Sequence, residues 1–424
     1  MDTTPKGNRL HIGLFGRTNV GKSSLMNLLL GEDLAITSPV AGTTTDVVEK
    51  AAELLPIGPV LFLDTAGLND TSTLAEQRLK KTAKIYERAD VILLVTEPEV
   101  WTAFEDDVLA KAAEKRIPVV AVINKIDLAK PTPVFIEQLK KKCGRVIEVA
   151  GTDLSGRDGY VNALKAQLIE AAPDDIIQNP TLAGDLVRPG GLAVLVVPID
   201  LQAPKGRLIL PQVQTIRDLL DNDAAAVVVK ERELSPMLAN LKEPPEIVIC
   251  DSQAILKVTA DVPASIKTTT FSILFARQKG DLAAAAQGAA AIDDLKPGDR
   301  VLIAEACSHH ALEDDIGRVK IPRWLRQYVG AEIKADVFAG RDYPENLSEY
   351  KLVIHCGACM LNRREMLSRI QKAREAGVPI TNFGVAISML QGVIKRALEP
   401  FPAALTAFER QLNARKAGGK QGLA

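Results

Sequence analysis

A glycine-rich loop between an apolar run and a helix-like segment is the feature that most constrains the fold of this chain. Residues 16–23 read Gly-Arg-Thr-Asn-Val-Gly-Lys-Ser and directly follow the apolar run at 10–15. In this context the backbone N–H groups of the loop, and the positive end of the next helix, surround phosphate groups. We therefore expect Lys22 to contact the outer phosphates and Ser23 to bind magnesium. The residues expected to bind the nucleotide here are Gly16, Asn19, Val20, Gly21, Lys22, Ser23 and Ser24.

Two further segments are expected to sense the outer phosphate and the magnesium ion. Asp64 ends the apolar run at 60–64 and is followed by Thr-Ala-Gly. A carboxylate at this place reaches magnesium through water, and Gly67 leaves its N–H free for the γ-phosphate. Residues 42–46 read Gly-Thr-Thr-Thr-Asp, and Thr44 is our assignment for a magnesium ligand there. The expected catalytic residues are Lys22, Thr44, Asp64 and Gly67, and the magnesium ligands are Ser23, Thr44 and Asp64.

The segment Asn124-Lys125-Ile126-Asp127 predicts which base the nucleotide carries. It follows an apolar run and resembles the Asn-Lys-x-Asp element of small GTPases. In that element the aspartate, which can only accept, takes both hydrogen-bond donors of the guanine edge, and adenine presents the opposite pattern. We therefore expect GTP in preference to ATP. The last base-contact element is weak, because Ala150-Gly151-Thr152 stands where relatives have Ser-Ala-Lys.

Apolar runs alternate with helix-like segments along most of the chain, which predicts an α/β protein. In the first part these runs indicate the buried strands of a mostly parallel sheet, in a P-loop GTPase fold. The alternation resumes twice, so three consecutive α/β domains are expected. The expected divisions are a GTP-binding domain at 1–172, a linker at 173–190, a second domain at 191–278, a third at 279–412 and a disordered tail at 413–424.

Three of the four histidines and three of the five cysteines lie in two short strings. The first is Cys307-Ser308-His309-His310 and the second is His355-Cys356-Gly357-Ala358-Cys359, and each follows an apolar run. Ligands gather beyond the carboxyl ends of parallel strands, so the two strings can face one another. Three thiolates with an imidazole suit tetrahedral zinc or three corners of a 4Fe-4S cluster. Spacing leaves both open. The remaining candidates, which we expect to be structural or bystanders, are His11, Cys143, Cys250 and His310.

Charge and composition exclude several classes of protein. The net charge is −1 and aromatic residues make up 4% of the chain, which disfavours nucleic-acid binding. No stretch approaches 18 uninterrupted apolar residues, so no membrane span is expected. Five cysteines in a chain of 424 residues do not indicate a disulfide framework. We expect a protein of the cytoplasm.

The nucleotide motifs resemble those of translation-factor GTPases, close to the Era and tRNA-modifying members. Leu68 stands where Ras-like proteins have a water-orienting glutamine, so unaided hydrolysis is expected to be slow. Asn19 matches the P-loop asparagine that coordinates a monovalent cation in the potassium-activated relatives. The resemblance therefore implies hydrolysis that is stimulated by potassium.

The chain combines the nucleotide motifs with the two cysteine–histidine strings, and this combination resembles the FeFe-hydrogenase maturation GTPases, the HydF family, over essentially the whole chain. Neither the nucleotide motifs nor the cysteine–histidine strings alone would identify this family. The resemblance implies a GTPase domain, a dimerisation domain and a 4Fe-4S-binding domain. It implies that Cys307, Cys356 and Cys359 hold the cluster, with the fourth iron open or held by His309, His355 or an exchangeable ligand.

The function implied by this resemblance is that of a scaffold. It would receive a di-iron precursor from radical-SAM maturases and deliver it to apo FeFe-hydrogenase, as a homodimer or a larger oligomer. The expected cofactors are GTP, Mg²⁺, a 4Fe-4S cluster and K⁺. One alternative is an RNA- or ribosome-associated GTPase with a structural zinc module. Another is a redox enzyme that uses the cluster for electron transfer under the control of GTP.

Overall fold

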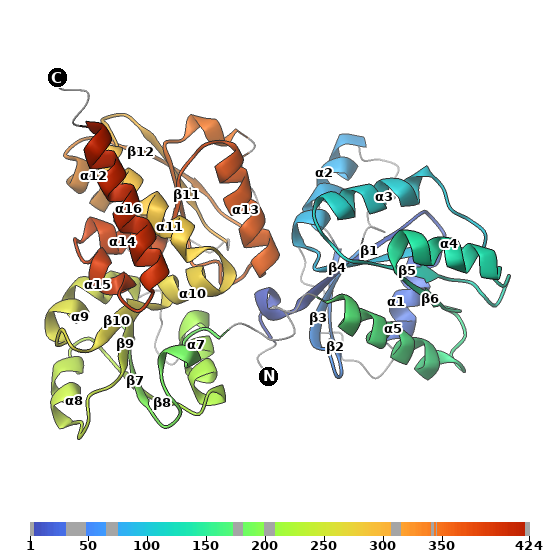
Figure 1. The fold of residues 1–424 in the computed structure, drawn as a ribbon, viewed down its shortest axis with the longest axis horizontal. Coiled ribbons are helices and arrows are strands. Elements are labelled where there is room, and N and C mark those ends of the chain that lie inside the picture. The colour runs from blue at the N-terminus through green and yellow to red at the C-terminus, as the bar shows by residue number, and fades with distance from the viewer. Residues whose placement is uncertain are drawn as a thin grey trace. The chain divides into compact units, whose positions relative to one another are not determined.

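The chain folds into two compact units that divide between residues 180 and 181 (Figure 1). The structure, a computed structural model, describes residues 4–30, 48–64, 75–172, 181–198, 208–306, 315–340, 343–344 and 346–419. Unit 1 contains one sheet, and unit 2 contains two. The expected α/β class is confirmed, and each of the three expected domains contains one sheet, although the second and third belong to one compact unit.

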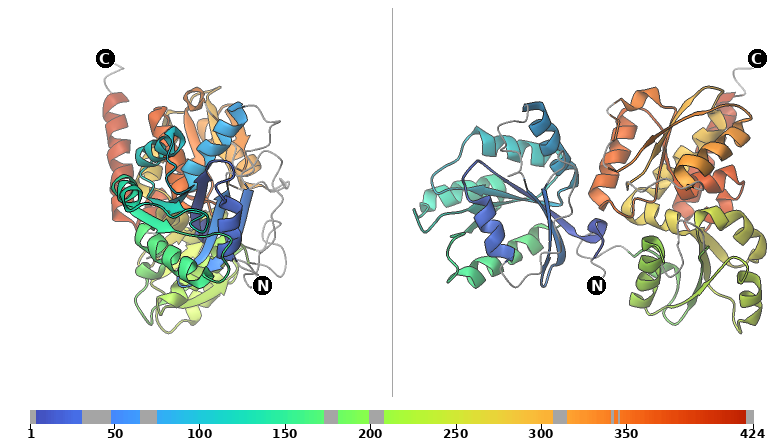
Figure 2. Two further views of the ribbon diagram at one scale, coloured as in Figure 1. Left: turned by 90° about the vertical axis from the view of Figure 1, so that its right-hand side faces the viewer. Right: turned by 180° about the vertical axis from the view of Figure 1, so that it is seen from behind.

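Unit 1 holds a six-stranded sheet in the order β2-β3-β1-β4-β5-β6, in which β2 alone runs antiparallel to its neighbour. Its strands are β1 (Leu10–Gly16), β2 (Val48–Leu54), β3 (Gly58–Asp64), β4 (Val91–Thr96), β5 (Val119–Ile123) and β6 (Arg145–Glu148). Its helices are α1 (Lys22–Leu30), α2 (Ala75–Arg88), α3 (Ala103–Glu114), α4 (Pro133–Cys143) and α5 (Arg157–Ala171). Helices α1 and α5 pack on one face, and α2, α3 and α4 pack on the other (Figure 2).

The burial of the central strands explains their continuous apolar sequences. Every residue of β1 and β4 is buried, because helices cover both faces of the sheet. Strand β2 is an edge strand in which exposed and buried residues are mixed. Its sequence, VEKAAEL, lacks the apolar run that marks the others. We therefore did not expect a strand there.

Unit 2 holds two four-stranded sheets in which every strand pair is parallel. The middle sheet has the order β10-β9-β7-β8, and the third sheet has the order β12-β11-β13-β14. The strands are β7 (Leu192–Val196), β8 (Ala225–Val229), β9 (Ile247–Cys250), β10 (Lys267–Thr270), β11 (Arg300–Ala304), β12 (Lys334–Phe338), β13 (Leu352–His355) and β14 (Ile380–Asn382).

The helices of unit 2 connect these strands and cover the sheets (Figure 1). They are α7 (Leu210–Asp221), α8 (Leu234–Asn240), α9 (Ile255–Asp261), α10 (Phe271–Lys279), α11 (Leu282–Ala289), α12 (Ile321–Val329), α13 (Arg363–Glu375), α14 (Phe383–Leu390), α15 (Ile394–Leu398) and α16 (Pro402–Gly419). Short helical turns lie at Gly184–Leu186, Ser252–Ala254, Ala290–Asp294, Ile316–Lys320 and Leu347–Glu349.

One continuous hydrophobic core joins the middle and third sheets, which is why unit 2 is a single compact unit. Val194 of β7, Ile303 of β11 and Phe275 of α10 belong to the same buried cluster. Helix α11 approaches β14 closely because Gly288 has no side chain: a Cβ atom there would lie 2.0 Å from the carbonyl oxygen of Ile380. The boundary that we expected at residue 278 falls inside α10.

Two of the expected divisions are wrong in part. The expected linker at 173–190 includes Leu182, Ala183 and Val187, which are buried in the core of unit 2. The expected disordered tail at 413–424 is helical as far as Gly419, because α16 continues to that residue. No helix in the described part of the chain is long and apolar enough to span a membrane.

Candidate functional site

The phosphate-binding loop follows β1 and leads into α1, as the motif predicts. Asn19, in the left-handed region at φ +65°, and Ser23 are exposed, Val20 is fully buried, and Ser24 is half-buried. Gly21 has a φ of +90°, and a Cβ atom at this residue would lie 2.2 Å from Nδ2 of Asn124. Glycine is therefore required here both by backbone conformation and by space.

Lys22 is held against its own loop. Its Nζ donates to the carbonyl oxygens of Gly16 at 2.7 Å and of Arg17 at 2.8 Å. Burial lowers the pKa of Lys22, and the charge of Asp64 opposes this effect. Asp64 ends β3 and is 7% exposed. The ammonium group and the carboxylate thus stand at the same edge of the sheet, where a phosphate–magnesium pair requires one group of each sign.

Asn124 connects the guanine element to the phosphate-binding loop. Its Nδ2 donates to the carbonyl oxygen of Val20 at 2.9 Å, and its Oδ1 accepts from the N–H of Gly151 at 2.9 Å. Asp127 is exposed, and one of its carboxylate oxygens accepts from Thr152 Oγ1 at 3.3 Å. The two expected base-contact segments therefore meet, although the second has an atypical sequence.

A row of ion pairs beside this site was not expected from the sequence. Arg17 donates from Nε to Oε1 of Glu105 at 2.7 Å, and its Nη2 lies 3.8 Å from Oε2 of Glu97. Glu97 also pairs with Lys125. Glu105 is fully buried, and its second oxygen accepts from the backbone N–H of Thr102, the N-cap of α3. The phosphate loop and the guanine element are thereby tied to α3.

The contact with Arg17 contributes to a lowered pKa of Glu105. Burial alone would raise this pKa, but hydrogen bonds from Thr102 and Arg17 outweigh it, and the pKa lies below its ordinary value. The sequence signal for this contact is the capping-box pattern Thr-x-x-Glu at 102–105. That pattern predicts the helix start and contains no sign of the partner in the phosphate loop.

Thr44 and Gly67 lie outside the described residues. The expected assignments of Thr44 as a magnesium ligand and of Gly67 as the γ-phosphate sensor therefore remain predictions. Leu68 also lies outside the described part of the chain.

The second candidate site lies where two neighbouring strands of the third sheet end. Strands β11 and β13 are parallel, with Ala304 paired to His355. The backbone N–H of Ala306 donates to Sγ of Cys356 at 3.1 Å, and the N–H of Ala358 donates to the same sulfur at 3.5 Å. Hydrogen bonds donated to sulfur favour its charged, metal-binding form.

The turn between the two cysteines has an uncommon backbone conformation. Ala358 has a φ of +54°, which residues with a side chain rarely adopt. Such a residue costs about 1–3 kcal/mol and persists where its surroundings hold it, often at functional sites. Ala358 is 2% exposed and packs in the core between the third sheet and α13.

His355 is engaged through both ring nitrogens. Its Nδ1 donates to the carbonyl oxygen of Cys356 at 2.9 Å, and its Nε2 accepts from Nη1 of Arg369 at 3.0 Å. Burial and then the charge of Arg369 lower the pKa of His355 to about 3, although the Cys356 carbonyl opposes them. The geometry therefore argues against His355 as a cluster ligand. It holds the Cys356 peptide instead.

Cys359 lies beside a buried lysine. Lys279, at the end of α10, is 4% exposed, and its Nζ donates to the carbonyl oxygens of Cys359 at 3.2 Å and Leu361 at 2.9 Å. Burial lowers the pKa of Lys279 to about 8, and the charge of the Cys359 thiolate opposes this shift. Burial also raises the pKa of Cys359, and Lys279 opposes that. The sequence gives no sign of this lysine, because basic residues such as Arg277 and Lys279 are common in the last turn of a helix.

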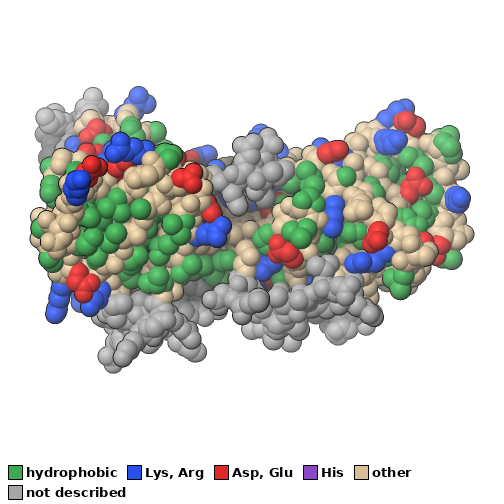
Figure 3. Space-filling view, turned by 90° about the horizontal axis from the view of Figure 1, so that it is seen from below, with side chains coloured by type: hydrophobic (Ala, Val, Ile, Leu, Met, Phe, Trp, Pro, Cys, Tyr) green, Lys and Arg blue, Asp and Glu red, His purple; other side chains and the backbone are tan. Residues whose placement is uncertain are grey.

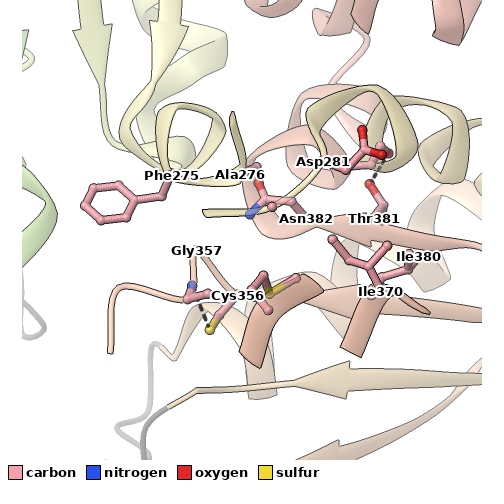
Figure 4. Close-up of a pocket in the computed structure, with 13 residues that line it drawn as sticks. Phe275, Ala276, Asp281, Cys356, Gly357, Ile370, Ile380, Thr381 and Asn382 are labelled. Carbon is pink, nitrogen blue, oxygen red and sulfur yellow. Dashed lines mark hydrogen bonds between the residues drawn. The ribbon is translucent and has the colours of Figure 1, made fainter. Parts of the chain in front are cut away.

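A small cavity separates the cysteine turn from α10 (Figure 4). It offers about 20 Å³ to the centre of a water molecule, which is room for roughly one water. Cys356 and Gly357 line it from below, and Phe275 and Ala276 of α10 line it from above. The side of the turn that faces α10 is thus largely packed.

Cys307, His309 and His310 lie outside the described residues, but the chain on either side of them is held in place. Glu305 is 2% exposed and accepts from Nη2 of Arg318 at 2.9 Å. This ion pair joins residue 305 to residue 318 on the two sides of the segment that contains Cys307. The end of the described chain that precedes Cys307 lies beside Cys356, because the Sγ of Cys356 accepts from the N–H of Ala306.

The donor set fits a thiolate-bound metal group in its chemistry. Cys356 and Cys359 both carry sulfur, and the Cys356 sulfur accepts hydrogen bonds from two backbone N–H groups. Within the ranges that the structure describes, no three His, Cys, Asp or Glu side chains form a metal-binding group. A complete set therefore requires Cys307 or His309. Cys250 is fully buried in unit 2, Cys143 ends α4 and His11 lies in β1.

Family models match three consecutive parts of the chain. A "Hydrogen maturase F dimerization domain" matches residues 182–280, and a "Hydrogen maturase F tetramerization domain" matches residues 283–400, together about half of the chain. The chain belongs to the hydrogen maturase F family. A "50S ribosome-binding GTPase" model matches residues 11–125. This family member therefore carries a GTPase domain, which supports binding of GTP and Mg²⁺, and its other domains imply hydrogenase maturation and oligomerisation.

Curated relatives are similar to this chain over part of its length. The tRNA modification GTPase MnmE of Laribacter hongkongensis is 38% identical over 164 residues, which are 38% of this chain and 34% of the relative. MnmE of Nitrosomonas europaea is 36% identical over 172 residues, which are 39% of this chain and 36% of the relative. The chain thus spans about a third of the length of these relatives. The activity of these relatives as whole proteins is therefore not assigned to this chain.

Two solved GTPase structures are also similar to part of the chain. The G domain of the T. maritima FeoB iron transporter has 22% identity and a TM-score of 0.30, over 38% of this chain and 98% of that chain. A variant of Era from Aquifex aeolicus has 22% identity and a TM-score of 0.31, over 52% of this chain and 93% of that chain.

Proposed function

We propose that this chain is a GTP-hydrolysing scaffold that binds a 4Fe-4S cluster and delivers a di-iron precursor to apo FeFe-hydrogenase. The hydrogen bond from Ala306 to Sγ of Cys356 carries the proposal. It brings the residue that precedes Cys307 to within 3.1 Å of the Cys356 sulfur, although the two cysteines are far apart in sequence. Cys307, Cys356 and Cys359 would hold the cluster.

The fourth iron has no assigned protein ligand among these cysteines. His355 is unsuited because both ring nitrogens are bonded, so His309 or an exchangeable ligand takes that place. An open corner suits a carrier, since four strong protein ligands would leave no position for a guest. The cargo comes from radical-SAM maturases, because the chain has no Cys-x-x-x-Cys-x-x-Cys pattern of its own.

GTP acts as a timer of partner binding and release. The γ-phosphate orders the loops at Thr44 and Gly67, and hydrolysis releases them. Hydrolysis is slow, because Leu68 cannot orient water as glutamine does. A potassium ion at Asn19 supplies the positive charge that an arginine finger supplies elsewhere. Lys22 and Ser23, with Asp64, hold the phosphates and magnesium.

A second copy of this chain is proposed to dock on the edge of the middle sheet. Strand β8 is an edge strand, and its Val228 is 42% exposed. The neighbouring helix α7 exposes Val213 and Leu220. Figure 3 shows hydrophobic side chains gathered on the underside of unit 2. Unpaired strand edges bordered by apolar side chains are templates for pairing between chains.

The proposed function is tested by metal analysis of the full chain purified without oxygen. We expect iron and sulfide in equal amounts, with absorption near about 400 nm from iron–sulfur charge transfer. Cys356→Ser should lose this absorption and keep GTP hydrolysis, whereas Cys143→Ser should keep both. A colourless protein loaded with zinc would contradict the proposal and support the RNA-associated alternative, which also predicts salt-dependent RNA binding.

A further inference from the structure

The turn that follows β4 carries two glutamates beside the guanine element. Residues 97–100 read Glu-Pro-Glu-Val, and the backbone N–H of Val100 donates to the carbonyl oxygen of Glu97 at 3.2 Å, which closes the turn. Pro98 suits the second position of a turn because its ring fixes φ at about −65°. Glu99 has a φ of +59°, in the left-handed region that residues with a side chain rarely adopt. The two glutamates are therefore held close together in a tight turn.

The two carboxylates contact opposite ends of the loop at 124–132, which contains the guanine element. Glu97 forms an ion pair with Lys125, near the start of this loop. Oε1 of Glu99 accepts from the backbone N–H of Thr132 at 2.6 Å, at the end of the loop. Thr132 is also the N-cap of α4. The turn at 97–100 thus holds the loop from both sides.

Lys125 is also in an uncommon backbone conformation, with a φ of +63°. Its partner Glu97 lies between it and the phosphate loop, because Oε2 of Glu97 is 3.8 Å from Nη2 of Arg17. The side chains of Glu97 and Lys125 are 29% and 31% exposed, so water partly screens their ion pair and its effect should be modest. Glu97 therefore fixes the place of Lys125 relative to the phosphate loop.

We propose that the turn at 97–100 determines how strictly the nucleotide site selects guanine, with Glu97 and Glu99 as positioning residues. The carboxylate of Asp127 can only accept, and both of its oxygens must be aligned to take the two donors of the guanine edge at once. A loop that is held at both ends keeps this alignment. The inference rests on the proposed GTP-binding function and deepens it on the base side of the nucleotide site.

Two substitutions in the full chain test the two contacts separately. Glu97→Gln removes the charge that pairs with Lys125, and Glu99→Gln weakens the acceptor for the N–H of Thr132. Glu137→Gln, at an exposed glutamate of α4, is the matched control. The probes are GTP and inosine triphosphate, whose base lacks the exocyclic amino donor of guanine. The readouts are the dissociation constants of both nucleotides and the unfolding midpoint.

We expect the dissociation constant of inosine triphosphate divided by that of GTP to fall about threefold in each of the two variants, which is in the range of a partly exposed contact. GTP loses one of two hydrogen bonds to a misaligned carboxylate, whereas inosine triphosphate forms only one and tolerates the misalignment. Glu137→Gln should keep the wild-type ratio. A turn that merely stabilised the domain would raise both dissociation constants by the same factor, and that unchanged ratio would overturn the proposal.

Failure of this inference can be told apart from failure of the proposed function. A wild-type chain that binds both nucleotides equally, or binds neither, contradicts guanine recognition by Asp127 and with it the role of the turn. A wild type that prefers GTP, with the same preference in Glu97→Gln and Glu99→Gln, overturns the role of the turn alone. A lowered ratio in one variant supports the proposal for that contact and overturns it for the other.

Discussion

The nucleotide site and the cysteine site both lie at the carboxyl ends of parallel strands, yet different chemical groups surround them. Around the phosphate loop, charged side chains form a row of pairs: Lys125 with Glu97, and Arg17 with Glu105. Around Cys356 the contacts to sulfur come from backbone N–H groups. A multiply charged ligand needs charges held firmly in place, whereas a soft metal ligand needs dipoles that leave the sulfur free to bind metal.

The two sites also differ in how they depend on distant parts of the chain. The phosphate loop is contiguous, and Asn124 fixes its position with one side chain. The cysteine site depends on the pairing of β11 with β13 and on a lysine from α10. We therefore expect substitutions at one site to leave the other site's readout unchanged.

The largest effect is expected for Lys22→Ala. Removing the ammonium group that faces the outer phosphates should slow GTP hydrolysis by about 100-fold or more. Iron content should not change, because Lys22 bonds only with the loop carbonyls of Gly16 and Arg17 among the contacts described above. Phosphate release and iron analysis on one sample test this. Lys115→Ala, at an exposed lysine beside α3, is the control. Loss of iron in Lys22→Ala would contradict the expectation that the two sites are independent of each other.

A smaller effect is expected for Glu105→Gln. The variant leaves Arg17 without its buried counter-charge, and GTP affinity should fall about tenfold, which is about 1.4 kcal/mol. Fluorescent-nucleotide titration measures it. Glu114→Gln changes an exposed carboxylate of the same helix and should have no effect. An equal loss in both variants would mean that general destabilisation of α3 is the cause.

The pH dependence of the same contact follows from the lowered pKa of Glu105. A carboxylate whose folded pKa lies below its unfolded value stabilises the fold above the unfolded value. This contribution is lost as the pH falls through the folded pKa. Wild-type stability should therefore fall in acid more steeply than that of Glu105→Gln. Parallel denaturation curves across the acid range would contradict this.

At the cysteine site, Arg369→Gln should reduce iron retention several-fold and leave GTP hydrolysis unchanged. Arg369 is 4% exposed and donates to Nε2 of His355 and to the Gly340 carbonyl oxygen at 3.0 Å each. Its loss leaves His355 without a donor, at a cost of about 1–3 kcal/mol. Arg374→Gln on the exposed side of α13 is the matched control. Equal iron retention in both variants would contradict the claim that His355 positions Cys356.

The smallest effect is expected from the monovalent cation. GTP hydrolysis should be several-fold faster in potassium than in sodium at equal ionic strength, because Asn19 has an exposed side chain within the phosphate loop. Asn19→Ala should remove the difference. Iron content should be equal in both salts. Equal rates in the two salts would contradict a cation-binding role for Asn19, which would then be only a residue of the turn.

The sequence predicted the elements that carry local signals. Periodic apolar runs indicated β1, β4 and β5, and the order of motifs indicated the nucleotide site. Strand β2 was missed because its residues mix exposed and buried positions. The shared core of the middle and third sheets was missed because it depends on α10 packing against distant elements.

The cysteine site was predictable in its residues and not in its details. The clustering of cysteines indicated the ligands, and strand ends indicated where they meet. The bonding of His355 and the approach of Lys279 come from Arg369 on α13 and from the end of α10. No local pattern in a sequence records such tertiary partners.

The most direct test of this account is the proximity of Cys307 to the cysteine turn. The metal-free full chain would be treated with a mild oxidant, and its peptides would be analysed by mass spectrometry. Cysteines form a disulfide only where their Cα atoms approach to about 7 Å or less. We expect a bond from Cys307 to Cys356 or Cys359. If Cys307 remains freely alkylated while no such bond forms, the joint iron site and the carrier function are contradicted.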